Sequence, residues 1–185
     1  MNNTITFKDM LRILARREFY IDMLVFFLIC VPCVLLFLFG IRMFENYINI
    51  GQFIHYPYNL LFFLLFSPSG FLFIWYSYTY LIIYGEGSPC PQIGGTTKLV
   101  TVGPYAYVRH PSVIGKFFGV LGVGFLSGSP IFVFIVIPIL TIWSAYYNRF
   151  IQEKYTEEKF GQAYAEYRKG TPMFIPNFRK KVTCK

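Results

Sequence analysis

Three long apolar segments constrain the fold of this chain more than any other feature. They cover about residues 19–41, 58–84 and 113–147. A helix needs about 20 apolar residues to cross the hydrocarbon core of a bilayer. The third segment is long enough for two short helices, because Ser127-Gly128-Ser129-Pro130 divides it and Pro130 suits the first turn of a helix. The sequence therefore predicts an all-α, polytopic membrane protein with about four transmembrane helices.

The composition agrees with this prediction and argues against a nucleic-acid-binding protein. Only 14% of the 185 residues are charged, whereas a soluble domain has about 25%. The net charge is +8, and the basic residues collect near the two ends of the chain, beside apolar segments. That distribution is typical of attraction to anionic lipid headgroups. We expect membrane lipids as partners, and no nucleic acid.

The polar segments complete the predicted architecture, a single membrane domain over residues 1–185. Residues 1–84 hold an interfacial amphipathic helix at about 4–18 and the first two spans, of which the second has a kink or hinge at Ser67-Pro68-Ser69-Gly70. Residues 85–185 hold a Gly/Pro-rich loop, a helical hairpin and a polar helix that runs to about Lys169. The N-terminal segment, the second loop and the C-terminal segment have more basic residues than the first loop and the hairpin turn, which predicts that both termini are cytoplasmic.

The cysteines and histidines do not suggest a metal site. Cys30 and Cys33 form a C-x-x-C pair inside an apolar segment, where small buried residues are the simpler explanation. His55 and His110 lie far apart and share no ligand spacing with the cysteines. We expect no metal.

Two polar clusters next to the apolar segments can carry chemistry. Arg109 and His110 precede the hairpin, where they either bind lipid headgroups or belong to a site. Arg149, Glu153 and Glu157 are spaced by four residues, so they share a helix face on which Arg149 and Glu153 can pair. This face is either simply solvated or part of the same site.

Several motifs in the C-terminal half of the chain resemble those of isoprenylcysteine carboxyl methyltransferases and related phospholipid methyltransferases. The resemblance covers about residues 84–178. Its elements are Gly85-Glu86-Gly87-Ser88-Pro89 with Pro91, then Gly103-Pro104-Tyr105, Arg109-His110-Pro111-Ser112 and Gly115, and finally Glu153, Phe160-Gly161, Tyr164, Tyr167, Pro172 and Ile175-Pro176.

The resemblance implies an enzyme that uses S-adenosyl-L-methionine and methylates a lipophilic acceptor reached from the bilayer. The candidate cofactor-binding residues are Gly103, Tyr105, Arg109, His110, Arg149 and Glu153, and the candidate catalytic residues are Arg109 and His110. Arg109 can bind a carboxylate through paired hydrogen bonds, and His110 can act as a base if the acceptor must lose a proton. We expect Arg109→Ala and Glu153→Ala to abolish cofactor binding without unfolding the protein.

The sequence leaves the acceptor and two other functions open. Gln152 stands where the family has a first acid, and Val113 where it has an aromatic residue. A prenylated cysteine carboxylate, a phospholipid amine and a small lipophilic thiol are all candidate acceptors. The alternatives are an NADPH-dependent enzyme similar to the sterol reductases, which share an Arg-His-Pro motif but are much longer, and a membrane protein that has lost its catalytic activity.

Overall fold

The computed structural model describes residues 35–86 and 95–176. Over these residues the chain is helical and contains no strand, which confirms the all-α prediction. Residues 35–47 are helical, followed by α3 (Tyr58–Gly85) and α4 (Pro111–Ser127). A short 3-10 helix, η2 (Gly103–Ala106), lies between α3 and α4. The predicted amphipathic helix at 4–18 and most of the first span lie outside the described residues.

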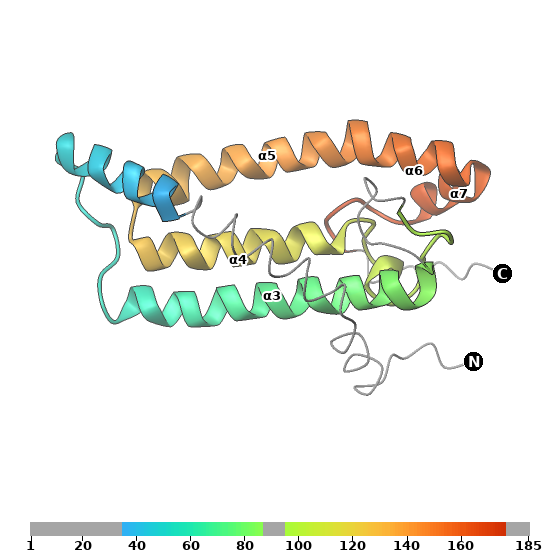
Figure 1. The fold of residues 1–185 in the computed structure, drawn as a ribbon, viewed down its shortest axis with the longest axis horizontal. Coiled ribbons are helices and arrows are strands. Elements are labelled where there is room, and N and C mark those ends of the chain that lie inside the picture. Colours follow the sequence, from blue (N-terminus) through green and yellow to red (C-terminus); the bar gives the residue numbers. More distant parts are fainter. Residues whose placement is uncertain (1–34, 87–94, 177–185) are drawn as a thin grey trace. The chain divides into compact units, whose positions relative to one another are not determined.

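The C-terminal half is a series of helical segments in which two π-helices interrupt the α-helix. They are η3 (Phe132–Val136), α5 (Ile137–Tyr147), η4 (Asn148–Gln152), α6 (Glu153–Phe160) and α7 (Gln162–Gly170), coloured orange to red in Figure 1. The sequence predicted one polar helix to about Lys169, but Gly161, with φ +54°, separates α6 from α7. A positive φ is open to glycine without strain, and it ends the first helix there.

Two helices in the described part of the chain are long and apolar enough to cross a membrane. They are Tyr58–Gly85 and the continuous segment Phe132–Phe160, with mean hydropathies of 1.7 and 1.3 and few buried residues. Pro68 does not end the second span, because α3 continues through it, and the kink or hinge predicted there stays a prediction. A proline removes one hydrogen-bond donor, a loss that a membrane helix tolerates. The predicted hairpin turn is confirmed, since α4 ends at Ser127 and the next helix begins at Pro130.

The chain divides into two compact units. The second unit comprises residues 35–68 and 118–140 of the described chain, and its core is formed by Leu38, Phe132, Val133 and Ile137. A buried polar contact ties its helices together. Ser129 Oγ donates to Glu45 Oε1 at 2.6 Å and accepts from the backbone N–H of Phe132, as an N-cap residue does. Ile131 N–H donates to the same Glu45 oxygen at 2.9 Å.

The first unit comprises residues 69–117 and 141–176 of the described chain and holds both polar clusters. Its core includes Tyr80, Val100 and Tyr105. Gly115 of α4 lies so close to α3 that a Cβ there would stand 2.8 Å from the Gly70 carbonyl oxygen, which requires glycine. The loop after α3 returns to the end of that helix, where the N–H groups of Thr97 and Lys98 donate to the Gly85 carbonyl.

Candidate functional site

A tight turn in front of α4 directs the loop motif into the first unit. Gly103 has φ +62°, and a Cβ on it would lie 2.1 Å from the Tyr80 ring, so only glycine fits. Pro104 is the second residue of η2, and its carbonyl accepts from the N–H of Val108. Tyr105 is buried by this turn, and its carbonyl accepts a 2.6 Å hydrogen bond from the Tyr167 hydroxyl. Burial raises the pKa of Tyr105 well above its ordinary value, so the phenol stays neutral.

The next two residues pair with the chain after α7 through their backbone. The N–H of Arg109 donates to the Pro172 carbonyl at 2.9 Å, and the N–H of His110 to the Met173 carbonyl at 3.2 Å. Pro111 then occupies the first turn of α4, where its missing N–H costs nothing. This local structure fixes the direction in which both side chains leave the backbone.

The two polar clusters predicted from the sequence meet at the Glu153 carboxylate. Arg109 Nε donates to Oε1 at 2.9 Å, and His110 Nε2 lies 3.3 Å from the same oxygen. Arg149 Nη1 donates to Oε2 at 2.7 Å, which confirms the expected pairing one turn apart. Three basic side chains thus surround one acid.

Burial argues against the simpler explanations for Arg109, His110 and Glu153. The side chain of Glu153 is 1% exposed, and those of Arg109 and His110 are 9% and 11% exposed. A headgroup anchor or a solvated helix face would leave these side chains open to water. Glu157 is different, since it is partly exposed and pairs with Arg168 at 2.6 Å.

The Arg109 guanidinium is held mostly by the protein itself. Nη1 donates to the carbonyls of Arg168 and Thr171, both at 2.9 Å, and Nη2 lies 2.8 Å from Glu153 Oε1. An arginine has five N–H donors, and these contacts use most of them. In this arrangement Arg109 joins the start of α4 to the start of α6 and to the end of α7.

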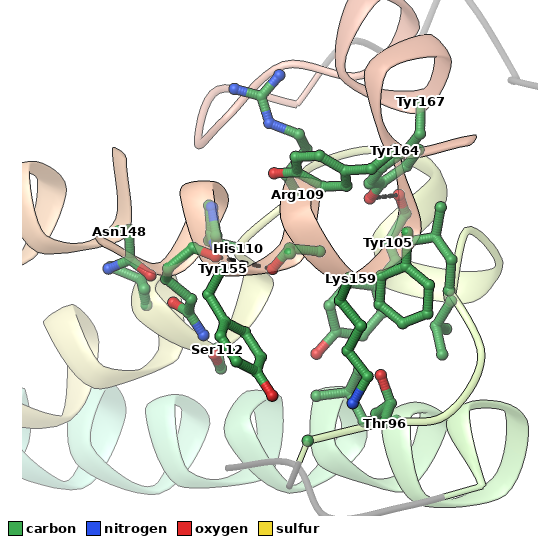
Figure 2. A pocket seen from close by; sticks show the side chains of 18 of the residues that line it. Thr96, Tyr105, Arg109, His110, Ser112, Asn148, Tyr155, Lys159, Tyr164 and Tyr167 are labelled. Atoms are coloured by element: carbon green, nitrogen blue, oxygen red, sulfur yellow. Dashed lines mark hydrogen bonds between the residues drawn. The ribbon is translucent and has the colours of Figure 1, made fainter. Parts of the chain in front are cut away.

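A cavity of about 270 Å³ lies in the first unit, beside these residues. Its wall includes Tyr78 and Leu81 of α3, the loop around Thr96, the first two turns of α4, and parts of α5 to α7. Of the predicted site residues, Tyr105, Arg109 and His110 line it, whereas Gly103, Arg149 and Glu153 do not. Figure 2 shows the tyrosines Tyr105, Tyr164 and Tyr167 on one side of the cavity and Asn148 on the other.

The π-helix η4 shapes the wall opposite these tyrosines. Its wider turn, in which the Glu153 N–H bonds to the Asn148 carbonyl, brings Asn148 and Gln152 to the cavity and places Glu153 behind it. Asn148 is buried, and its amide donates to the Ser144 carbonyl at 2.6 Å. Sequence reasoning missed Asn148 and Ser144. The available signal was two polar residues near the end of an apolar helix.

A known protein family matches the segment of the chain that forms most of the cavity wall. The family model described as phospholipid methyltransferase matches residues 61–163, more than half of the chain. The chain belongs to the phospholipid methyltransferase family. All residues that line the cavity, except Tyr164 and Tyr167, lie within the matched segment.

The curated relatives are similar to this chain over less than half of its length. The protein-S-isoprenylcysteine O-methyltransferase of Schizosaccharomyces pombe is 43% identical over 79 residues, which are 42% of this chain and 33% of that protein. The human protein of the same name is 37% identical over 87 residues, which are 44% of this chain and 28% of that protein. The Saccharomyces cerevisiae protein is 35% identical over 79 residues, which are 42% of this chain and 32% of that protein. The chain thus covers about a third of the length of these relatives.

Proposed function

We propose that this chain is a membrane-embedded methyltransferase that uses S-adenosyl-L-methionine to methylate a lipophilic acceptor. The observation that carries the proposal is the coincidence of the family match with the cavity wall. The names of the relatives favour an oxygen atom as the nucleophile. In an S-prenylated cysteine that oxygen belongs to the carboxylate, because the sulfur is already substituted.

The residues around the cavity fit the proposed cofactor. The cavity volume of about 270 Å³ lies just below the ~300–1,000 Å³ range of small-molecule sites. Ser112, Asn148 and Thr156 offer hydroxyl and amide groups for ribose and base, and tyrosine faces attract a sulfonium. When bound, the cofactor would supply an electrophilic methyl group to the carboxylate oxygen and would leave as a neutral thioether, so that no proton has to move.

The six predicted site residues take two kinds of role in this proposal. Tyr105, Arg109 and His110 line the cavity and contact the bound molecules. Gly103, Arg149 and Glu153 act through them, because Gly103 permits the turn, and Glu153, braced by Arg149, fixes the side chains of Arg109 and His110. A carboxylate acceptor needs no general base, so His110 then binds and orients rather than removing a proton.

We also propose that the chain crosses the bilayer four times with both termini in the cytoplasm. The two long apolar helices and the distribution of basic residues support this topology. Terminal tags that are protected from protease in sealed cells, and cleaved once the membrane is permeabilised, are the expected result. An external terminus would overturn the count of spans.

Calorimetric titration of the detergent-purified protein tests the function. We expect S-adenosyl-L-methionine to bind and NADPH not to bind. Binding of NADPH alone would instead support the reductase, and binding of neither by a folded sample would support a protein without catalytic activity. Tyr105→Ala in the same assay tests the cavity, since a variant that binds the cofactor as tightly as the wild type would place the site elsewhere.

A further inference from the structure

Lys116 is the only charged residue of α4, whose sequence is otherwise apolar or small. It lies in the second turn of the helix, is exposed, and lines the cavity together with Ser112 and Val113. A lysine within an apolar membrane helix is costly, and such residues usually serve a substrate or an ion. We therefore expect the Lys116 ammonium on the cavity wall to pair with a negatively charged or hydrogen-bonding group.

Within the described part of the chain no hydrogen bond or ion pair engages Lys116. Glu153, the acid of the candidate site, is already surrounded by Arg109, His110 and Arg149. The expected partner thus comes from a bound molecule.

The charge of the cavity wall indicates what that molecule carries. Arg109, Lys116 and Lys159 line the cavity, and no described lining residue is an aspartate or a glutamate. Arg109 is occupied by Glu153 and by two carbonyls. Lys159 lies 5.8 Å from the centre of the Tyr155 ring and has other contacts of its own. Next to Lys116, such a wall attracts an anion and repels a protonated amine.

We infer that Lys116 binds the carboxylate of the methyl acceptor and thereby selects anionic over amine acceptors. The inference rests on the proposed function. Leu81 and Val113, which line the same cavity, offer apolar surface for the lipophilic part of the acceptor. The compact ammonium pairs with the carboxylate and holds it in place, so Lys116 contributes to acceptor binding and specificity.

Kinetics with a defined acceptor test the inference. The probe is N-acetyl-S-farnesylcysteine, and the variants are Lys116→Met, Lys116→Arg and, as a control, Lys154→Met, an exposed lysine that does not line the cavity. We expect Lys116→Met to raise KM for the probe by about 10- to 100-fold, with a smaller change in kcat. Lys116→Arg should recover most of the loss, and Lys154→Met should behave as wild type.

Two binding measurements accompany the kinetics. Calorimetry should give the same Kd for S-adenosyl-L-methionine in all variants, which also shows that each variant is folded. The carboxamide analogue of the probe, a competitive ligand without charge, should bind wild type and Lys116→Met equally. If Lys116→Met weakens cofactor binding in parallel, the lysine is a cofactor ligand and the inference is wrong.

Other outcomes separate this inference from the proposed function. An unchanged KM in Lys116→Met, with the cofactor bound and methyl transferred, overturns the role of Lys116 and leaves the methyltransferase intact. Methylation of phosphatidylethanolamine in vesicles, without methylation of the farnesyl carboxylate, overturns the acceptor class in the same way. Failure of the wild type to bind S-adenosyl-L-methionine refutes the proposed function itself.

Discussion

Arg109 and Glu153, which are 44 positions apart in the chain, form a buried ion pair in which Nη2 lies 2.8 Å from Oε1. The pair connects the loop in front of α4 with the first residue of α6, and His110 and Arg149 complete the contacts of the carboxylate. Removal of one member of such a pair leaves uncompensated buried charge. The pair is therefore as much a part of the fold as of the candidate site.

Glu153→Gln tests how much this carboxylate contributes to the stability of the fold. The amide keeps the shape of the side chain but removes the negative charge beside Arg109 and His110, so we expect a loss of about 3–5 kcal/mol in the free energy of unfolding. Thermal unfolding of the purified protein with and without cofactor measures the effect. Glu158→Gln, at an exposed position of the same helix, should leave the unfolding temperature unchanged. Equal unfolding temperatures for the two variants would contradict the prediction.

Arg109→Lys separates the charge of Arg109 from its branched geometry. A lysine can still pair with Glu153, but it cannot also reach the carbonyls of Arg168 and Thr171 as the guanidinium does. We expect a loss of about 1–3 kcal/mol in stability together with weaker cofactor binding. From the sequence alone, the alanine variants at 109 and 153 were expected to lose binding without unfolding. The contacts now predict that both properties fall together, and an unfolding curve that matches the wild type would show that they do not.

Tyr167→Phe removes one buried hydrogen bond. The Tyr167 hydroxyl donates to the Tyr105 carbonyl at 2.6 Å, and without it that carbonyl lacks this partner in the core. We expect a loss of about 1–2 kcal/mol. Tyr164→Phe is a matched control, because its ring is buried to the same extent. Chemical unfolding of the two variants should show the larger loss of unfolding free energy for Tyr167→Phe. The opposite order would contradict a stabilising hydrogen bond between the Tyr167 hydroxyl and the Tyr105 carbonyl.

Gly103→Ala tests the turn that buries Tyr105. The alanine Cβ would overlap the Tyr80 ring, and the φ of +62° is unfavourable for alanine, so we expect destabilisation by at least about 1 kcal/mol and weaker cofactor binding. Gly119→Ala has open space around its Cβ and should be neutral or slightly stabilising. Thermal unfolding and calorimetry provide both readouts. A fully stable Gly103→Ala protein would show that the turn can relax.

Ser129→Ala tests the polar contact in the second unit. Ser129 caps the helix that begins at Pro130 and donates to Glu45, so its loss should cost about 1–2 kcal/mol. Glu45→Gln weakens the same contact from the other side. Both substitutions affect the same hydrogen bond between Ser129 and Glu45. The double variant should therefore lose less unfolding free energy than the sum of the losses of the two single variants. Strict additivity in unfolding experiments would contradict this coupling.

The features predicted correctly from the sequence are those that depend on local composition. Apolar length predicted the helices, the residues around Gly128 predicted the hairpin turn, and the spacing of four predicted the pair Arg149–Glu153. The contact between Arg109 and Glu153 was not predictable in this way, because it depends on how the two helices pack. The π-helix at Asn148–Gln152 also has no local signature, and it decides that Asn148 faces the cavity and Glu153 does not.

The continuity of α3 through Pro68 has a physical reason. In water a proline within a helix exposes a carbonyl that finds new partners easily, so the helix often ends there. A helix surrounded by apolar material keeps its remaining hydrogen bonds, because the alternative is several unpaired backbone groups. The proline at position 68 therefore stays within α3.

The contacts between Arg109 and the end of α7 have a consequence for biosynthesis. The ribosome makes Arg109 59 residues before Arg168 and 62 residues before Thr171, whose carbonyls it binds. Until these residues are synthesised, the Arg109 guanidinium lacks the carbonyls of Arg168 and Thr171 as hydrogen-bond acceptors. The last turn of α7, which carries Tyr167 of the cavity wall, and Thr171 after it thus complete the contacts of Arg109, and a chain that stalls before them would lack these contacts. Quality control of this protein can accordingly depend on a segment that lies outside every predicted span.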